Sequence, residues 1–190
     1  NSNSAIPPPS SLIRINFAPE RPDSHDFSFK GVVTNAAFSR SQGGTPEIAL
    51  SGPLDGILIE KSARRMTLFQ NGAAVRIWPI ALGFSPRGDK ACEGDGRTPE
   101  GSFAIARRND QSSYHLSLGL DYPQPADIAA ARDGGYSPGG DIMIHGQPNS
   151  LPEALMMQGD WTAGCIALTN AQMRDIWGHA PVGTKVEIRP

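Results

Sequence analysis

Residues 142–146 read Ile-Met-Ile-His-Gly, and residues 159–168 read Gly-Asp-Trp-Thr-Ala-Gly-Cys-Ile-Ala-Leu. The first stretch predicts a short β-strand that ends on His145, because three apolar residues precede the histidine. The second stretch predicts a Gly-Cys turn that leads from a loop into another apolar segment. We therefore expect a β-rich chain in which the imidazole of His145 and the thiol of Cys165 come together where two strand-sized segments meet a loop.

The composition and the remaining apolar runs also favour a mainly β domain. The chain has 190 residues and a mass of 20.2 kDa, which suits one domain with a tail. Its 21 Gly and 17 Pro favour a turn-rich β architecture over a helical bundle. A helix is expected at 170–177, with Thr169 as N-cap, Gln172 as its capping-box partner and Gly178 past its end. Further expected elements are strands at 57–59, 66–70, 75–78, 103–105, 142–144 and 184–189, a hairpin turn at Asn71-Gly72 and a short helix within 123–132.

Residues 1–54 form a segment rich in Pro, Ser and Gly, which we interpret as an N-terminal arm or linker. Its two apolar islands, at 12–17 and 27–33, could instead add an edge strand to the domain. From residue 55 onward the pattern changes to short strands. We therefore place the folded domain at 55–190.

Charge and cysteine content argue against several classes of function. With 17 basic and 19 acidic side chains, the net charge is −2, so no surface for nucleic acid is expected. No apolar run reaches the roughly 18 residues of a membrane span, and the start at Asn1 is compatible with earlier removal of a leader or anchor. Cys92 and Cys165 are too few for a disulfide scaffold, and with His145 they lack the paired spacing of a zinc site. No metal is expected.

The His145 and Cys165 pair suits nucleophilic catalysis. A thiol is a poor nucleophile until it loses its proton, and a nearby imidazole can accept that proton. Gly164 leaves a substrate carbonyl unobstructed, and the N–H groups of Gly164 and Cys165 are candidate donors to a developing oxyanion. The alternative is structural: a lone Cys is often a small buried apolar residue, and a His at a strand end is often a hydrogen-bonded polar residue.

The pattern resembles the signature of the YkuD-type L,D-transpeptidases, in which a His and a loop precede a Ser or Thr, any residue, Gly and Cys. Here that segment is residues 162–165, Thr-Ala-Gly-Cys, and the 16 residues 146–161 separate it from His145. The resemblance spans about residues 56–188 and extends to residues 98–103, Thr-Pro-Glu-Gly-Ser-Phe, and 137–141, Ser-Pro-Gly-Gly-Asp. The form of residues 159–167 is similar to a murein L,D-transpeptidase-like proteobacterial branch of the family.

The resemblance implies a fold and a catalytic centre. The fold would be a mainly β sandwich of two mixed sheets with a few short helices. Cys165 would be the nucleophile, His145 the base, and Gly164 part of the oxyanion site. The backbone carbonyl of Gly146 would orient the imidazole, so that neither an Asp nor a cofactor is required.

The substrate groove is less sharply defined by the sequence. Arg97 is a candidate for binding a substrate carboxylate, although a solvated arginine in a turn is the alternative. Tyr122 and Trp161 could form walls of the groove or simply pack, and Thr162 and Ala163 adjoin the nucleophile. Asp141 and Asp160 also lie near the pair, and we interpret both as turn or capping residues.

The implied function is acyl transfer on peptidoglycan stem peptides in the periplasm or cell envelope. A thioester would form at the L-centre of meso-diaminopimelate, and an amine would resolve it by cross-linking or exchange. The alternative is hydrolysis at the same position, for example release of an envelope lipoprotein, because Ala163 and Ala167 replace larger polar residues of many transferases. A silent wall-binding module is a third interpretation. Carbapenem-type inhibitors are expected to acylate Cys165, and Cys92 is expected to stay unpaired.

Overall fold

The computed structural model describes residues 49–190. Most of the arm or linker expected at 1–54, with its two apolar islands, lies outside the described residues. The strands are β1 (Gly56–Glu60), β2 (Arg65–Gln70), β3 (Ala73–Pro79), β4 (Gly101–Asn109), β5 (Ser117–Leu120), β6 (Met143–His145), β7 (Ile166–Ala167) and β8 (Lys185–Arg189). The helices are α1 (Pro125–Gly134) and α2 (Asn170–Trp177). In the described residues, neither helix is long and apolar enough to span a membrane.

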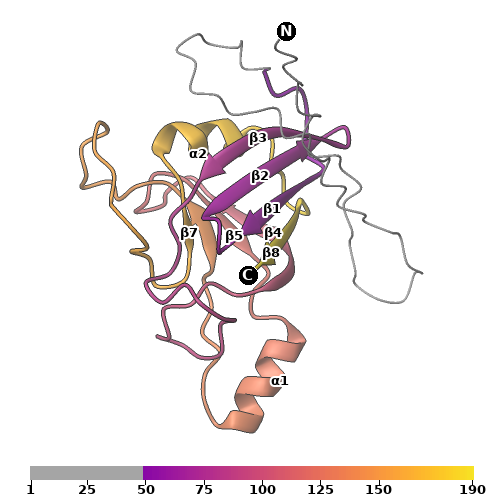
Figure 1. Ribbon diagram of the computed structural model, residues 1–190, viewed down its shortest axis with the longest axis vertical. Helices are drawn as coiled ribbons and strands as arrows, with labels where there is room; N and C mark the ends of the chain where they lie inside the picture. The colour runs from indigo at the N-terminus through magenta and orange to yellow at the C-terminus, as the bar shows by residue number, and fades with distance from the viewer. Residues whose placement is uncertain (1–48) are drawn as a thin grey trace, which may run out of the picture.

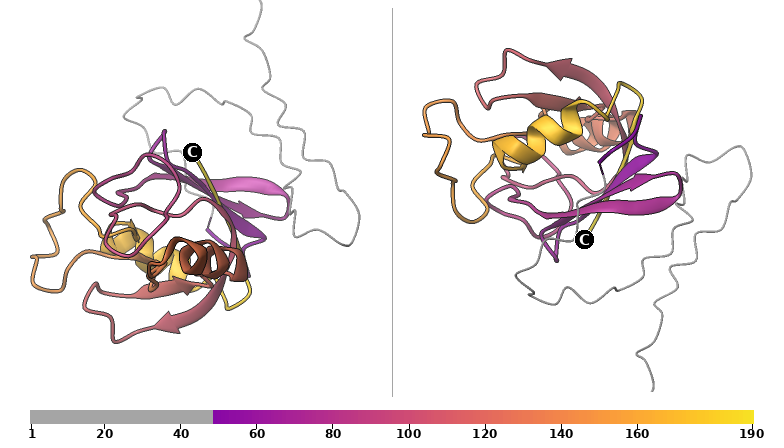
Figure 2. Two further views of the ribbon diagram at one scale, coloured as in Figure 1. Left: turned by 90° about the horizontal axis from the view of Figure 1, so that it is seen from below. Right: turned by 90° about the horizontal axis from the view of Figure 1, so that it is seen from above.

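The eight strands form one curled, mixed sheet in the order β3-β2-β1-β8-β4-β5-β6-β7 (Figure 1). Strand β4 joins its two parts, because residues 101–104 pair with β8 and residues 105–109 pair with β5. Figure 2 shows α2 between these two parts, with β1–β3 on one side and β4 and β5 on the other. The two mixed layers expected from the sequence are therefore two parts of one continuous sheet, and the mainly β class is confirmed.

One hydrophobic core lies between the two parts. It combines residues of β1 and β2 such as Ile57 and Leu68 with residues of β5 and β6 such as Leu118 and Ile144. Helix α2 adds Met173 and Ile176, both fully buried; Thr169 Oγ1 accepts the Gln172 N–H at 3.1 Å, and Gln172 Oε1 accepts the Thr169 N–H at 3.0 Å. This confirms the expected capping box.

Several local expectations are confirmed and others are revised. Asn71 and Gly72 have φ values of 52° and 74°, as a tight hairpin requires. Gly178 follows α2 with φ −67°, so it is not a left-handed cap. Strand β4 is longer than expected, and the sequence pattern did not reveal β5, because Ser117-Leu-Gly-Leu is short and contains a Gly.

A buried lysine ties β1 to the long segment between β3 and β4. Lys61 follows β1, is 2% exposed, and donates to the carbonyls of Gly88 and Thr98 at 2.6 and 2.7 Å. It also forms an ion pair with Glu100 at 2.8 Å. All three ammonium donors therefore have partners, as a buried charge requires, and the segment that contains Gly88, Thr98 and Glu100 is held against β1.

Candidate active site

His145 and Cys165 lie on one face of the second part of the sheet. Strands β6 and β7 are parallel, with Ile144 opposite Ile166, and both of these residues face the core at 0% exposure. Side chains alternate along a strand, so His145 and Cys165 point to the other face. They are two residues apart in register on adjacent strands, which places their Cα atoms about 8 Å apart, a span that the two side chains can bridge.

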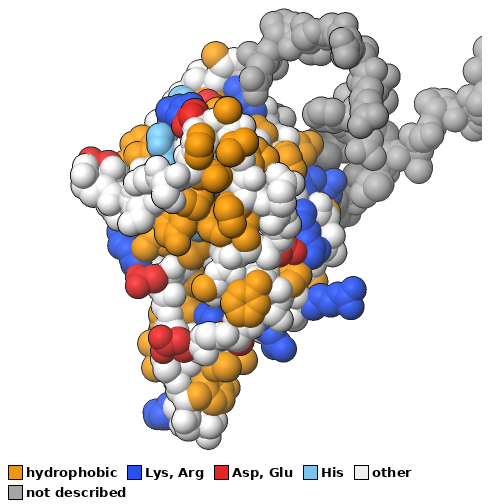
Figure 3. Space-filling view, turned by 90° about the vertical axis from the view of Figure 1, so that its left-hand side faces the viewer, with side chains coloured by type: hydrophobic (Ala, Val, Ile, Leu, Met, Phe, Trp, Pro, Cys, Tyr) orange, Lys and Arg blue, Asp and Glu red, His pale blue; other side chains and the backbone are white. Residues whose placement is uncertain are grey.

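This face forms the floor of a cavity of about 620 Å³. Its lining comes from β4, β5 and β6 and from the loops around them: Arg107, Asn109, Ser112, Ser113, Tyr114, Ser117, Asp141, Met143, His145, Trp161, Thr162, Ala163 and Cys165. The cavity thus contains both members of the predicted catalytic pair. Figure 3 shows the side of the domain that carries the 147–161 loop, where hydrophobic side chains gather between scattered charged groups.

The imidazole of His145 is buried and held in one orientation. It is 4% exposed, and its Nδ1–H donates to the carbonyl of Gly146 at 2.7 Å. Because a carbonyl can only accept, Nδ1 carries a proton, so in the neutral imidazole Nε2 keeps its lone pair. Burial lowers the pKa of His145, and the bond to Gly146 only partly offsets this. The rings of Tyr114 and Trp161 flank the imidazole at centroid distances of 4.7 and 5.6 Å.

The surroundings of Gly146 leave no room for a Cβ atom, so only glycine fits at this position. Its N–H donates to the carbonyl of Tyr114 at 3.0 Å. A Cβ at this position would lie 2.6 Å from Asn170 Oδ1 at the start of α2, and that oxygen already accepts the Gln147 N–H at 2.8 Å. Helix α2 therefore sets the position of the carbonyl that orients His145.

The Cys165 thiol is half-buried and hydrogen-bonded to the backbone. Its Sγ donates to the carbonyl of Asp141 at 3.3 Å. Burial raises the pKa of the Cys165 thiol; the Met143 N–H and the charges of Lys90 and Arg107 oppose this, while Asp141 adds to it. A raised thiol pKa beside a lowered imidazole pKa disfavours a standing ion pair. The arrangement suits proton transfer from the thiol to His145 during attack.

Thr162 builds the turn that presents the thiol. It is 4% exposed, and its Oγ1 donates to the Cys165 carbonyl at 2.7 Å and accepts the Gly164 N–H at 3.1 Å. The Gly164 N–H, expected to bind an oxyanion, is therefore already engaged. Among the described residues, no hydrogen bond is assigned to the Cys165 N–H, so of the two N–H groups expected to bind an oxyanion only this one has no partner.

The comparison with known families agrees with this geometry. The family model of the YkuD L,D-transpeptidase catalytic domain matches residues 55–188. The chain belongs to the YkuD family.

Solved structures with the same fold support this assignment. Pgp2, the helical cell shape determining protein of Campylobacter jejuni, is 26% identical with a TM-score of 0.54, over 76% of this chain and 51% of that chain. Bd1075 of Bdellovibrio bacteriovorus is 21% identical with a TM-score of 0.51, over 75% of this chain and 50% of that chain, and it shows the fold alone. The YkuD chain thus spans about half the length of these two proteins. No curated protein sequence matches the chain.

Two of the predicted substrate residues of the YkuD domain lie away from the cavity. Arg97 donates from Nη1 to the Asp89 carbonyl at 3.2 Å, and it is not among the residues that line the cavity. Its backbone carbonyl, however, supports the catalytic turn: Gly164 has φ 136°, and a Cβ there would lie 2.7 Å from Arg97 O. Tyr122 is 5% exposed, and its hydroxyl donates to the Pro138 carbonyl at 2.9 Å. The predicted neighbours Trp161 and Ala163 do line the cavity.

The two aspartates near the catalytic pair have structural partners. Asp160 accepts the Leu82 N–H at 3.0 Å and forms an ion pair with Arg64 at 2.8 Å. Asp141 has a φ of 54° and contacts Arg107. Both therefore fit the interpretation as turn residues.

A buried ion pair fixes the loop that precedes Arg97. Lys90 is 7% exposed, and its Nζ donates to Asp95 at 2.8 Å and to the Cys92 carbonyl at 3.0 Å. Burial opposes the charge on Asp95, but Lys90 and the backbone N–H groups of Arg97, Ala91 and Cys92 outweigh it and lower the pKa of Asp95 to about 2. Cys92 and Cys165 are both free thiols.

Sequence reasoning missed the side of the cavity formed by β4 and β5. Arg107 and Asn109 of β4 and Ser117 of β5 line it. Ser117 is 2% exposed and lies opposite His145 in the sheet, and among the described residues its Oγ has no assigned hydrogen bond. Only the strand register, which the sequence did not reveal, brings these residues to the catalytic face.

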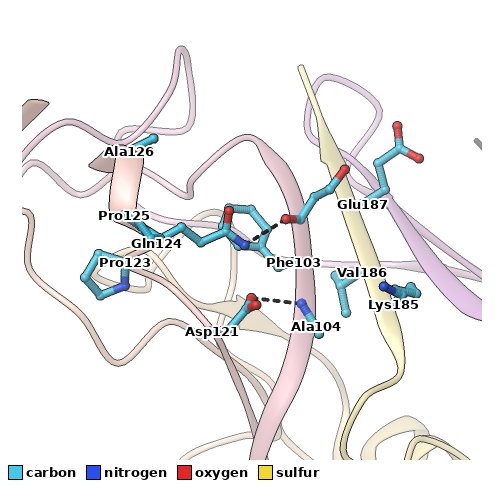
Figure 4. A pocket seen from close by; sticks show the side chains of 11 residues that line it. Phe103, Ala104, Asp121, Pro123, Gln124, Pro125, Ala126, Lys185, Val186 and Glu187 are labelled. Atoms are coloured by element: carbon cyan, nitrogen blue, oxygen red, sulfur yellow. Dashed lines mark hydrogen bonds between the residues drawn. The ribbon is translucent and has the colours of Figure 1, made fainter. Parts of the chain in front are cut away.

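Another cavity, of about 730 Å³, lies between β4, β8 and the start of α1 (Figure 4). Gln124 Nε2 donates there to the Ser102 carbonyl at 3.0 Å, and Asp121 accepts the Ala104 N–H at 2.8 Å. Its lining contains neither Cys nor His. It therefore offers no nucleophile and base pair comparable with that of the catalytic cavity.

Proposed function

We propose that this YkuD domain is a cysteine-dependent L,D-transpeptidase that acts on peptidoglycan stem peptides. The observation that carries the proposal is that Cys165 and His145 line the same cavity, and that His145 Nδ1–H is bound to Gly146 so that Nε2 is the nitrogen left to act as a base. Membership of the YkuD family, shown by the match over residues 55–188, makes acyl transfer the expected reaction class. No cofactor is required for this chemistry.

In the first half-reaction, the Cys165 thiol gives its proton to His145 Nε2 as the sulfur attacks the carbonyl carbon at the L-centre of meso-diaminopimelate. The carbonyl electron pair moves to oxygen, and the Cys165 N–H stabilises that oxyanion. The intermediate collapses, the bond to the residue at stem position four breaks, and His145 returns the proton to the departing amine. A thioester on Cys165 and a free D-amino acid result.

In the second half-reaction, an amine attacks the thioester. His145 takes a proton from the amine, the new amide forms, and the sulfur leaves and regains a proton. An amine of a second stem gives a 3-3 cross-link, and a free D-amino acid or a lipoprotein lysine gives exchange or attachment. This transpeptidation is our principal proposal.

Hydrolysis of the thioester is the second candidate. Ala163 lines the cavity and supplies no side-chain hydrogen bond to hold a second stem. Ala167, by contrast, cannot make room for water: it is 2% exposed, and its N–H and carbonyl both bond to Ala81, at 2.8 and 3.0 Å. Of the two alanines expected to favour hydrolysis, only Ala163 therefore supports it. Release of a lipoprotein or a D-amino acid without a new amide would be the result.

A role in the cell envelope follows from this proposal, because peptidoglycan lies there. Pgp2, which shares the fold, is described as determining helical cell shape, and we propose that this domain likewise acts in cell-wall remodelling. Stem peptides are the proposed partners, with an envelope lipoprotein as a possible acceptor and carbapenems as covalent inhibitors.

The test is product analysis with purified muropeptides. Wild type and Cys165→Ala would each be incubated with a disaccharide tetrapeptide and, separately, with a muropeptide that carries a lipoprotein peptide, and products would be identified by mass. We expect cross-linked or exchanged products from wild type and none from Cys165→Ala. Release of the linked peptide with no new amide would replace transpeptidation by hydrolysis, and no turnover of any donor would refute the proposed function.

A further inference from the structure

An arginine of β4 reaches across the sheet toward the nucleophile. Arg107 lies opposite Gly119 of β5, and Gly119 lies opposite Met143 of β6. Ile144 lies opposite Ile166 in the parallel strands, so Met143 and Cys165, each one residue earlier, are also neighbours. The row across the sheet is therefore Arg107, Gly119, Met143 and Cys165. A β-bulge between Ile105 and Arg107 is what turns Arg107 to this face, because simple alternation from the core residue Ile105 would point it the other way.

Gly119 provides the path for this side chain. A Cβ at position 119 would lie 2.7 Å from Arg107 Cγ, 3.0 Å from its Nε and 3.1 Å from its Cζ. The arginine therefore lies flat over the glycine backbone. Its Nη2 contacts the carboxylate of Asp141, and the backbone carbonyl of that same Asp141 accepts the Cys165 thiol. Asp141 thus contacts both the guanidinium of Arg107 and the thiol of Cys165.

The guanidinium keeps donors available for a ligand. It has five N–H groups, and among the described residues only the one that points to Asp141 has an assigned partner. Its side chain is 46% exposed and lines the catalytic cavity. Arg97, the carboxylate receptor expected from the sequence, is bound instead to a backbone carbonyl away from the cavity.

We propose that Arg107, positioned by Gly119 and Asp141, binds a carboxylate of the donor stem peptide. The proposal rests on the proposed function and specifies its substrate. A planar guanidinium matches a carboxylate through two parallel hydrogen bonds. A donor tetrapeptide carries two such groups near the scissile bond: the terminal carboxylate of the residue at position four and the carboxylate at the D-centre of diaminopimelate.

Three synthetic donors separate these sources. The first has both carboxylates, the second has a carboxamide at the terminus of position four, and the third has a carboxamide at the D-centre. The readout is kcat/KM for release of the residue at position four, which both transpeptidation and hydrolysis produce. For wild type we expect one amidation to lower kcat/KM by about tenfold or more, since a hydrogen bond to a charged group is worth about 1.5–3 kcal/mol.

One of the two amidated donors is expected to react more slowly with wild type. Arg107→Gln should lower kcat/KM for the first donor to the value that wild type shows with this slower donor, and the variant should turn over the two at equal rates. Arg108→Gln is the matched control, because it removes the same charge one residue away. Arg108 instead stacks on the Trp177 ring at 4.1 Å and donates to the Trp177 carbonyl. The Arg108→Gln variant should therefore discriminate between the three donors as wild type does.

Gly119→Ala tests the positioning, because it keeps the arginine but blocks its path. We expect it to lose the selectivity as Arg107→Gln does, with a thermal melt to verify folding. If wild type turns over all three donors equally, or if Arg107→Gln discriminates as wild type does, the proposal is overturned while the proposed function stands. If wild type releases position four from no donor, both are overturned.

Discussion

Replacing Thr162 by Val tests whether the hydroxyl of this residue builds the catalytic turn. The two side chains have nearly the same shape, so the change removes Oγ1 with little loss of packing. Two hydrogen bonds disappear: the one given to the Cys165 carbonyl at 2.7 Å and the one accepted from the Gly164 N–H at 3.1 Å. Thr162 is 4% exposed, so water cannot easily replace them.

The expected cost follows from these two bonds. A buried N–H left without a partner costs about 1–3 kcal/mol, and the lost bond to the partly buried carbonyl adds about 0.5–1.5 kcal/mol. We therefore expect the free energy of unfolding to fall by about 1.5–4.5 kcal/mol. At about 2–4 °C per kcal/mol for a domain of this size, Tm should fall by roughly 3–18 °C. A displaced thiol should slow acylation by about a hundredfold.

The assay combines a thermal melt with the rate at which a carbapenem acylates the protein, followed by intact-protein mass spectrometry. Thr162→Ser is the control, because it keeps the hydroxyl and loses one methyl group, at a cost of about 1 kcal/mol. It should acylate at close to the wild-type rate. Equal Tm values and equal acylation rates for Thr162→Val and wild type would refute the role of this hydroxyl.

Three further predictions concern the catalytic pair and its turn. Cys165→Ala and His145→Ala should each abolish turnover, and the double variant should lose no more than either single one; a Cys165→Ala protein that keeps more than about a thousandth of the wild-type rate would show that another group is the nucleophile. In a Cys92→Ala background, alkylation of Cys165 by iodoacetamide should be slow at neutral pH and rise as the pH passes above 9, because burial raises the pKa of the thiol and only the thiolate reacts. An alkylation rate that is already at its plateau at pH 6 would instead indicate a standing ion pair of thiolate and imidazolium. Turnover needs neutral His145, whose pKa is lowered by burial, so the turnover rate should hold down to about pH 6.5 and fall only below it. Gly164→Ala should lower the free energy of unfolding by about 1–3 kcal/mol, since φ is 136° and the new Cβ would lie 2.7 Å from Arg97 O; an unchanged melting curve would contradict this.

The features that depend on neighbours in the sequence were predictable. The capping box of α2 joins Thr169 to Gln172, three residues apart, and such local signals survive in the fold. The bond from His145 to the Gly146 carbonyl joins adjacent residues. His145 and Cys165 could be named as the candidate catalytic pair because a strand-ending His and a Gly-Cys turn match the order of residues in a known family.

The features that depend on strand register were not predictable. The bulge between Ile105 and Arg107 decides which face Arg107 occupies, and no residue signals it in the sequence. Tyr122 was expected in the groove, but it continues the alternation of Leu118 and Leu120 into the core. The Gly164 N–H was expected to be free, but the hydroxyl of Thr162 accepts from it.

Intact-protein mass spectrometry of the acyl-enzyme tests the central claim most directly. Wild type would be mixed with a disaccharide tetrapeptide in the absence of an added amine, quenched in acid and weighed, and then digested to locate the added mass. We predict an added mass equal to that of the donor minus the free D-amino acid released from position four, attached to Cys165, absent from Cys165→Ala and unaffected by Cys92→Ala. An adduct on any other residue, or release of position four with no mass added to Cys165 at any quench time, would contradict the thioester mechanism.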